Sequence, residues 1–284
     1  MLSKQLGAYA RLMRLHKPIG SLLLLWPTLW ALWVAGGGQP QPKIVLIMII
    51  GVFVMRSAGC VINDFADRNF DPHVERTKDR PLATKEVSVR EALILFVCLS
   101  LVGFILVLFL NRLSIILAFV GLFLAASYPF LKRVTGLPQF YLGIAFGWGI
   151  PIAFAAHLDT VPIVGWLILL ANIAWAGAYD TFYAMVDRND DLRIGVKSLA
   201  TLSGTSDRLV IGICQVVTLV ILGVVGYLEN LDGYYYLGLC GALCVGIWHQ
   251  YSCREDDREK FFAAFMGNSW FGAMVFGGIL LAYL

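Results

Sequence analysis

Long apolar stretches recur along the whole chain and constrain its fold more than any other feature. Each is about long enough to cross the roughly 30 Å hydrocarbon layer of a bilayer as a helix. The chain is 59% hydrophobic and only 14% charged, whereas soluble domains are about half apolar and a quarter charged. The sequence therefore predicts an all-α integral membrane protein with nine transmembrane helices in a bundle. The predicted spans are 19–34, 44–63, 92–110, 113–130, 140–156, 161–179, 209–227, 234–248 and 261–284.

Basic residues are distributed unevenly between the two ends of these spans. Lys and Arg near span ends are retained on the cytoplasmic side. If the N-terminus is cytoplasmic, all but two of the 22 Lys and Arg residues fall on that side, and only Lys43 and Arg112 fall outside. We therefore expect a cytoplasmic N-terminus and a C-terminus on the outer side. The first span lacks a convincing small-residue cleavage site, so it is interpreted as a retained helix.

The rest of the composition narrows the class of protein. Residues 1–284 contain no hydrophilic domain, so we expect a single transmembrane domain. The six cysteines show neither disulfide nor metal-ligand spacing and are interpreted as packing residues. The net charge of +3 follows from membrane orientation and gives no reason to invoke nucleic acid. No obligate protein partner is evident, and polarity is concentrated on the predicted cytoplasmic face.

Two clusters of acidic residues stand at the predicted cytoplasmic ends of spans. On a continuous helix, the polar residues between Met55 and Asp71 fall within about 100° of arc. These are Arg56, Asn63, Asp64, Asp67 and Asp71.

The second cluster repeats the spacing of the first. Asp187 and Asp191 reproduce the Asp67 and Asp71 pair 120 residues later, and Asp180 falls on the same helical face.

Carboxylates four residues apart on one face repel each other, and charge near the membrane is unfavourable. A hard cation such as Mg²⁺, held by a few carboxylates and substrate phosphate oxygens, would resolve this conflict. Two facing stripes would leave room for a diphosphate between two metals. The simpler alternative is that both clusters are solvated helix ends. Their identical spacing and their location on the same side of the membrane favour a binding site.

A bound diphosphate also needs basic donors. The candidates on the predicted cytoplasmic face are Arg68, Arg80, Lys132 and Lys197, with Tyr128 one helical turn before Lys132. Arg14 and Lys17 precede the first span and are candidates for an acceptor carboxylate. Each of these basic residues has an alternative role as an interfacial anchor.

Six motifs are distributed over nearly the whole chain: RLMRLHKPIGSLLLLWPTLWALW, AGCVINDFADRNFD, RTKDRPL, YPFLKRVTGLPQ, FGWGIPIAFAA and AYDTFYAMVDRNDDLRIGVKS. Through these motifs the sequence resembles the UbiA superfamily of intramembrane prenyltransferases, and within it the 4-hydroxybenzoate polyprenyltransferases of ubiquinone biosynthesis. The resemblance implies a nine-helix bundle around a central cavity, with segments 64–91 and 180–208 forming a cytoplasmic cap in the bacterial inner membrane.

The resemblance also implies roles for particular residues. Its metal and catalytic motif falls on Asn63, Asp67, Asp71, Asp187 and Asp191, with Asp64 as an adjacent metal candidate and Asp180 beside the acceptor. Its diphosphate contacts fall on Tyr128, Lys132 and Arg80. The implied activity is Mg²⁺-dependent transfer of a polyprenyl group from polyprenyl diphosphate to 4-hydroxybenzoate, ortho to the hydroxyl.

Two alternatives remain beside this interpretation. A sister enzyme would prenylate another acceptor, such as a naphthoate or a porphyrin, and the sequence around Arg14 and Lys17 does not separate them. An ion-coupled transporter would place carboxylates near the bilayer midplane, whereas here they gather at span ends. Prenyl chain length and oligomeric state are not encoded in any pattern of the sequence.

Overall fold

The computed structural model describes residues 2–195 and 197–284, and for residues 2, 3, 132 and 194 it describes the backbone alone. Within this part of the chain all regular structure is helical. The α-helices are α1 (Leu2–Leu12), α2 (Ile19–Ala35), α3 (Pro42–Asp67), α4 (Val89–Val107), α5 (Arg112–Ser127), α6 (Pro138–Gly147), α7 (Gly149–Leu158), α8 (Ile163–Ile194), α9 (Leu199–Ser203), α10 (Asp207–Leu228), α11 (Gly233–Ser252) and α12 (Arg258–Ala282). Short 3₁₀ helices are η1 (Asp71–His73), η2 (Tyr128–Arg133) and η3 (Gly204–Ser206).

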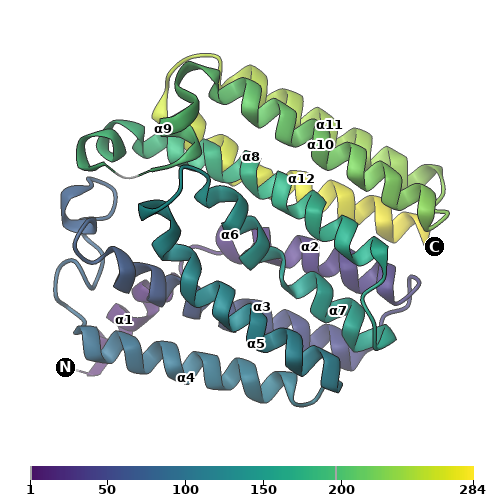
Figure 1. The fold of residues 1–284 in the computed structure, drawn as a ribbon, viewed down its shortest axis with the longest axis horizontal. Helices are drawn as coiled ribbons and strands as arrows, with labels where there is room; N and C mark the ends of the chain where they lie inside the picture. Colours follow the sequence, from purple (N-terminus) through teal and green to yellow (C-terminus); the bar gives the residue numbers. More distant parts are fainter. Residues whose placement is uncertain (1, 196) are drawn as a thin grey trace.

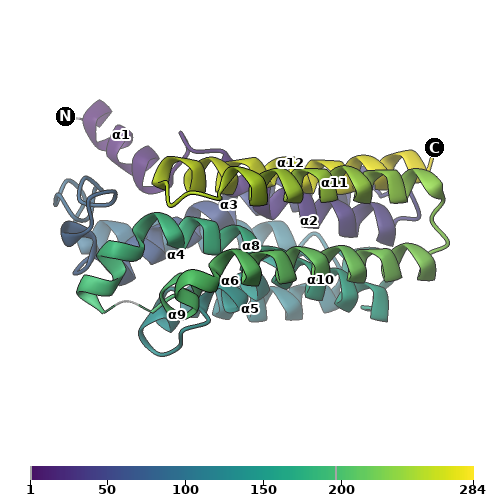
Figure 2. The same ribbon diagram turned by 90° about the horizontal axis from the view of Figure 1, so that it is seen from above.

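The long helices run side by side along one axis of the molecule (Figure 1). Helix α8 is central in the bundle and packs against α6, α10 and α12, while α2 packs against α7 and α12. The two termini lie at opposite ends in both views (Figures 1 and 2). We call the end that carries the connecting segments 68–88, 128–137 and 197–206 the cap end, which lies on the left in Figure 1.

The helices have the length and apolar character needed to cross a membrane. Among the described residues, seven helical segments meet both criteria, and α2 is apolar but has only 17 residues. Large apolar side chains such as Leu101, Phe123 and Val220 are more than half exposed on the outside of the bundle. An outward apolar surface of this kind suits lipid contact. The helical membrane fold is thus confirmed, and nine spans with a cytoplasmic N-terminus stay a prediction.

The predicted span 140–156 is one segment in sequence but two helices in the structure. Helix α6 ends at Gly147 and α7 begins at Gly149, with Trp148 between them. Pro151 has no N–H to donate to the carbonyl of Gly147, four residues earlier. The interruption therefore follows from the proline, and it points the Trp148 ring toward α5, where its Nε1 donates to the Leu117 carbonyl at 2.8 Å.

The first acidic cluster does not lie on one continuous helix, contrary to the prediction. Helix α3 ends at Asp67, and Asp71 opens the separate helix η1. The Phe70 N–H donates to the Asp67 carbonyl at 2.7 Å, which closes a turn, and Pro72 disfavours the α conformation at the residue before it. The predicted cap segment 180–208 also differs, because α8 continues as a helix to Ile194.

Large aromatic residues from three helices form the centre of the bundle. The Trp30 and Trp175 rings are fully buried with centroids 5.3 Å apart, and Trp175 stacks on Phe271 at 5.7 Å. Their indole N–H groups are satisfied: Trp30 donates to the Gly272 carbonyl at 3.0 Å and Trp175 to Asn268 Oδ1 at 3.2 Å. These bonds fix α2, α8 and α12 relative to one another.

Two glycines allow α11 and α12 to approach closely. A Cβ atom on Gly238 would lie 2.6 Å from Gly278 Cα, and one on Gly278 would lie 2.8 Å from the Tyr235 carbonyl oxygen. Both neighbours are backbone atoms, which cannot move without shifting a helix. Small residues at such crossings stabilise helix pairs in membranes through close packing.

We predict that Gly278→Leu separates α11 from α12 and destabilises the protein by roughly 1–3 kcal/mol or more, as overpacking does. Thermal unfolding of the purified protein in detergent measures this loss. The control is Gly277→Leu on the same helix, where a new Cβ meets no atom within 4 Å. Equal melting temperatures for the two variants would contradict the close-packing account.

Candidate active site at the cap end

The first acidic cluster is buried at the cap end of α3. Asp64 is 1% exposed, and Asp67 and Asp71 are each 4% exposed. The last turn of α3 carries Asp64 and Asp67, and the turn through Phe70 brings Asp71 back beside them. Carboxylates that are removed from water require compensating positive charge or hydrogen bonds.

Two arginines from different segments supply part of that charge. Arg80 Nη1 lies 3.0 Å from Asp64 Oδ1 and 2.9 Å from Asp71 Oδ2. Arg14 Nη2, from the segment between α1 and α2, lies 2.6 Å from Asp64 Oδ1. Arg80 therefore bridges two of the three carboxylates, and its predicted contact with a diphosphate stays a prediction.

Burial also changes the proton affinity of the cluster. It raises the pKa of Asp71 to about 6, against the opposing charge of Arg80, and the neighbouring carboxylates of Asp67 and Asp64 raise it further. Burial disfavours the charged form of Arg14, but Asp64, Asp71 and the other negative groups around it together outweigh burial and raise the pKa of Arg14. Burial therefore favours the protonated form of Asp71, and added positive charge would favour its carboxylate.

The second cluster is held by a third arginine. Arg76 Nε donates to Asp187 Oδ1 at 3.0 Å, and its Nη2 contacts the other carboxylate oxygen. The same guanidinium stacks over the Tyr183 ring, 4.1 Å from its centroid. Tyr183 and Asp187 are one helical turn apart on α8, so both face the incoming arginine. A bidentate pair of this kind fixes orientation as well as charge.

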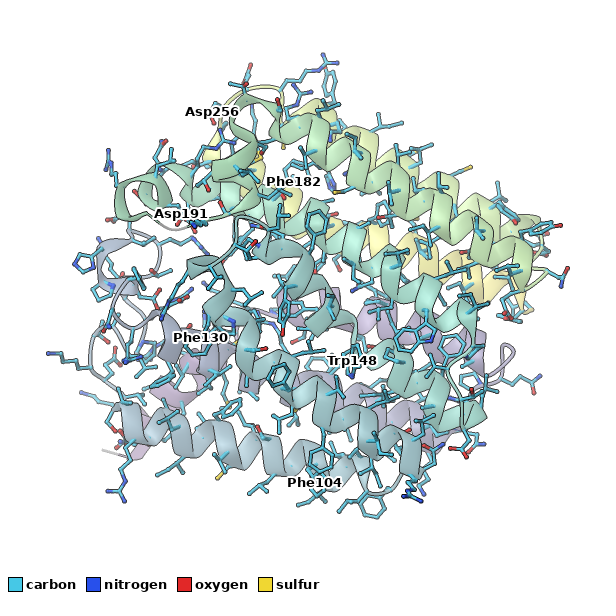
Figure 3. The ribbon with its side chains drawn as sticks, in the orientation of Figure 1. Phe104, Phe130, Trp148, Phe182, Asp191 and Asp256 are labelled. Atoms are coloured by element: carbon cyan, nitrogen blue, oxygen red, sulfur yellow. The ribbon has the colours of Figure 1, made fainter. Side chains whose placement is uncertain are left out.

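One short segment links the two clusters. Arg76 contacts the α8 cluster and Arg80 contacts the α3 cluster, yet only four positions separate them in the chain. Burial lowers the pKa of Lys17, and the charges of Arg14, Arg76 and Arg80 lower it further, so these basic groups converge. The acidic stripes therefore flank one basic centre at the cap end, where Asp191 also lies (Figure 3).

The remaining predicted residues differ in their surroundings. The Tyr128 hydroxyl donates to the Gly59 carbonyl at 3.2 Å, beside the first cluster. Arg68 bonds the Phe65 carbonyl at 2.8 Å and lies over that ring, so it is engaged with its own helix. Lys197 is exposed and Asn63 is half-buried. The predicted diphosphate contact of the Lys132 side chain lies outside the described residues.

A largely apolar cavity of about 740 Å³ lies within the bundle. Arg56, Gly59 and Tyr128 border it near the cap end, and Thr28 and Ser100 add polar groups farther along. Helices α2 to α7 form the rest of the wall from apolar side chains, including Phe104 and Trp148, which lie away from Asp191 (Figure 3). The charged side chain of Arg56 is thus adjacent to the apolar part of the cavity.

Arg56 is a site residue that sequence reasoning placed on the acidic stripe without giving it a role. It borders the cavity beside Gly59 and Tyr128. The sequence feature that points to Arg56 is its position inside an apolar span, where ionisable residues are functional candidates by default.

The carboxylates suit Mg²⁺ by their chemistry. No three acidic, histidine or cysteine side chains among the described residues converge on one ligating point. Mg²⁺ does not require such a cage, because it is usually bound by one or two carboxylates together with waters and substrate phosphates. Asp64, Asp67 and Asp71 on one side, and Asp187 and Asp191 on the other, provide hard oxygen donors of this kind.

Comparison with known proteins defines the family. Residues 24–282 match the UbiA prenyltransferase family. The chain belongs to this family. A curated relative from Nitrosococcus oceani, named 4-hydroxybenzoate octaprenyltransferase, is 58% identical and aligns over 100% of this chain and 99% of its own. A relative of the same name from Aeromonas salmonicida is 54% identical, with 100% and 99% coverage.

Solved structures agree with the UbiA assignment at the level of the fold. The apo structure of a UbiA homolog from Aeropyrum pernix K1 has a TM-score of 0.82 at 22% identity and covers 93% of this chain and 98% of that one. A UbiA homolog from Archaeoglobus fulgidus bound to DMAPP and Mg²⁺ has a TM-score of 0.67 at 14% identity, with 94% and 98% coverage. The chain is thus a multi-pass membrane protein of this fold.

We predict that Arg80→Ala destabilises the protein by roughly 3–5 kcal/mol, because it leaves buried carboxylates without their shared partner. Thermal unfolding in detergent measures the effect. The matched control is Lys78→Ala, which removes an exposed pair with Glu75 in the same segment and should leave the melting temperature close to that of the unaltered protein. A melting temperature for Arg80→Ala equal to that of the control would show that Arg80 does not balance the cluster.

Proposed function

We propose that this chain transfers a polyprenyl group from polyprenyl diphosphate to 4-hydroxybenzoate, at the carbon ortho to the hydroxyl, and releases diphosphate in a step of ubiquinone synthesis. The observation that carries this proposal is the pair of acidic clusters at the cap end, near an apolar cavity whose wall includes Arg56, Gly59 and Tyr128. A prenyl diphosphate has the same two parts, a charged head and an apolar tail. The names of relatives more than 50% identical over the whole chain support the acceptor.

The diphosphate is held at the cap end. Asn63 and the clustered aspartates would hold Mg²⁺, which would supply positive charge to the leaving diphosphate. The DMAPP and GPP complexes of the Archaeoglobus fulgidus homolog with Mg²⁺ support divalent metal use. Arg76 and Arg80 lie between the clusters and donate to phosphate oxygens, with Tyr128, Lys132 and Lys197 as further candidates. Arg68 is a weaker candidate because its guanidinium is engaged with Phe65.

The reaction breaks one bond and forms one. The allylic C–O bond breaks and its electron pair leaves with the diphosphate, so the prenyl carbon becomes cationic. The apolar wall excludes water, which would otherwise capture this cation. The electron-rich ring attacks it to form a C–C bond, and the ring proton passes to a carboxylate such as Asp187 or to the released diphosphate.

The acceptor is positioned at the polar mouth of the cavity. Its carboxylate needs a basic partner close to the point where the prenyl carbon is released. Arg56 borders the cavity there, and Arg14, Lys17 and Asp180 remain the predicted acceptor contacts. Arg56 lines the cavity and Arg14 does not, so Arg56 is the stronger candidate for the carboxylate.

The proposed location is the bacterial inner membrane, with nine spans and the cap end on the cytoplasmic side. Basic residues support this orientation, since all but two of the 22 lie on the predicted cytoplasmic face. In the proposed arrangement, segments 64–91 and 180–208 cover the site.

We predict that membranes containing this chain convert labelled 4-hydroxybenzoate and octaprenyl diphosphate to a prenylated product, and that EDTA abolishes the reaction. Asp67→Ala and Asp191→Ala should each lower the rate by at least about 10²-fold, the scale for losing a group that stabilises developing charge. Chromatography of the labelled product measures the rate.

Asp256→Ala is the control, because that aspartate is exposed in the connection before α12 and lies apart from Asp191 (Figure 3). It should retain the unaltered rate. Product formation that is insensitive to EDTA, or equal rates in all three variants, would contradict the proposed site.

A further inference from the structure

Gly51 occupies the middle of α3 and lines the apolar cavity. A Cβ atom at this position would meet no atom within 4 Å, and its φ is not in the left-handed region. Glycine inside a helix is destabilising relative to alanine, so a reason for it is usually found in a close contact or an unusual backbone conformation. Neither is present at Gly51.

Two other glycines of the cavity wall, Gly103 and Gly121, are explained by packing. A Cβ on Gly103 would lie 2.8 Å from Met55 Sδ, and one on Gly121 would lie 2.8 Å from Trp148 Cδ1. At Gly51 the space is open instead, and it belongs to the cavity. The absence of a side chain there widens the cavity.

The cavity continues past Gly51 toward the end of the bundle opposite the cap. Ile47 and Met48, one turn earlier on α3, also line it. Thirteen positions separate Gly51 from Asp64, which is about 20 Å along a helix. An extended geranyl chain is about 10 Å long and an extended octaprenyl chain about 40 Å, at about 1.2 Å per backbone bond. Only the longer chain reaches Gly51.

We propose that Gly51 is a specificity-determining residue that keeps the cavity open to long prenyl chains. The inference rests on the proposed function, since it assumes that the prenyl tail enters from the cap end. The tail of a long substrate passes over the bare backbone of Gly51, and short substrates end before it. A side chain at this position narrows the passage without touching the groups that hold the diphosphate.

The test compares two prenyl diphosphates in the same membranes, with labelled 4-hydroxybenzoate as acceptor. We expect Gly51→Phe to lower kcat/KM for octaprenyl diphosphate at least about tenfold, because the ring narrows the passage, and to leave kcat/KM for geranyl diphosphate within about twofold. The matched control is Gly223→Phe in α10, another helical glycine with open space, whose neighbours Val220 and Val224 are exposed. Its rates with both substrates should stay unaltered.

Gly51→Ala is the control for a folding defect, because alanine favours the helix and its Cβ meets no neighbouring atom. It should reduce octaprenyl transfer less than phenylalanine does and leave geranyl transfer unaltered, with an unaltered melting temperature. If both Gly51 variants retained the rates of the unaltered protein with both substrates, the inference would be overturned, because the prenyl tail would then not pass Gly51. Parallel loss of both substrates in a folded variant would overturn it too. Failure of the proposed function is distinguishable, because the unaltered chain would then prenylate 4-hydroxybenzoate with neither diphosphate.

Discussion

Buried carboxylates at the end of an apolar bundle are the feature on which the arrangement of the cap end depends. Asp64 and Asp71 are almost inaccessible to water and receive positive charge from Arg80 and Arg14. Breaking such a pair is strongly destabilising, because the remaining charge stays buried. The segments that carry the arginines are therefore held over the ends of the helices. The same contacts that order the cap also define its site.

This arrangement places buried negative charge near an apolar space. Burial raises the pKa of Asp71 to about 6, and added positive charge would favour its carboxylate form. The cavity is bordered by Arg56 and Tyr128 near the cap end and is lined mostly by apolar side chains. A ligand that matches both parts has a phosphorylated head, brought with a divalent cation, and a hydrocarbon tail. The chemistry of the UbiA prenyltransferase family meets this description.

Much of the fold was accessible from sequence because apolar length reports membrane helices directly. The residues of the acidic stripes were accessible as well, since helical periodicity placed Asp64 with Asp67, and Asp187 with Asp191. The break at Trp148 and the end of α3 at Asp67 were missed, although Pro151 and Pro72 are local signals for both. The pairing of Arg76 with Asp187, across 111 positions, depends on how the bundle closes. No periodicity in one helix encodes such a contact.

The central claim is that the two acidic clusters bind a divalent cation together with a diphosphate. The direct test is to titrate the purified protein with Mn²⁺ and to measure bound Mn²⁺ by electron paramagnetic resonance. The titration is carried out once with a non-reactive prenyl thiodiphosphate and once without it. The account predicts that the analogue increases Mn²⁺ affinity and that Asp67→Asn lowers the analogue-dependent affinity at least about tenfold. An Mn²⁺ affinity that changes neither with the analogue nor with the substitution would contradict the account.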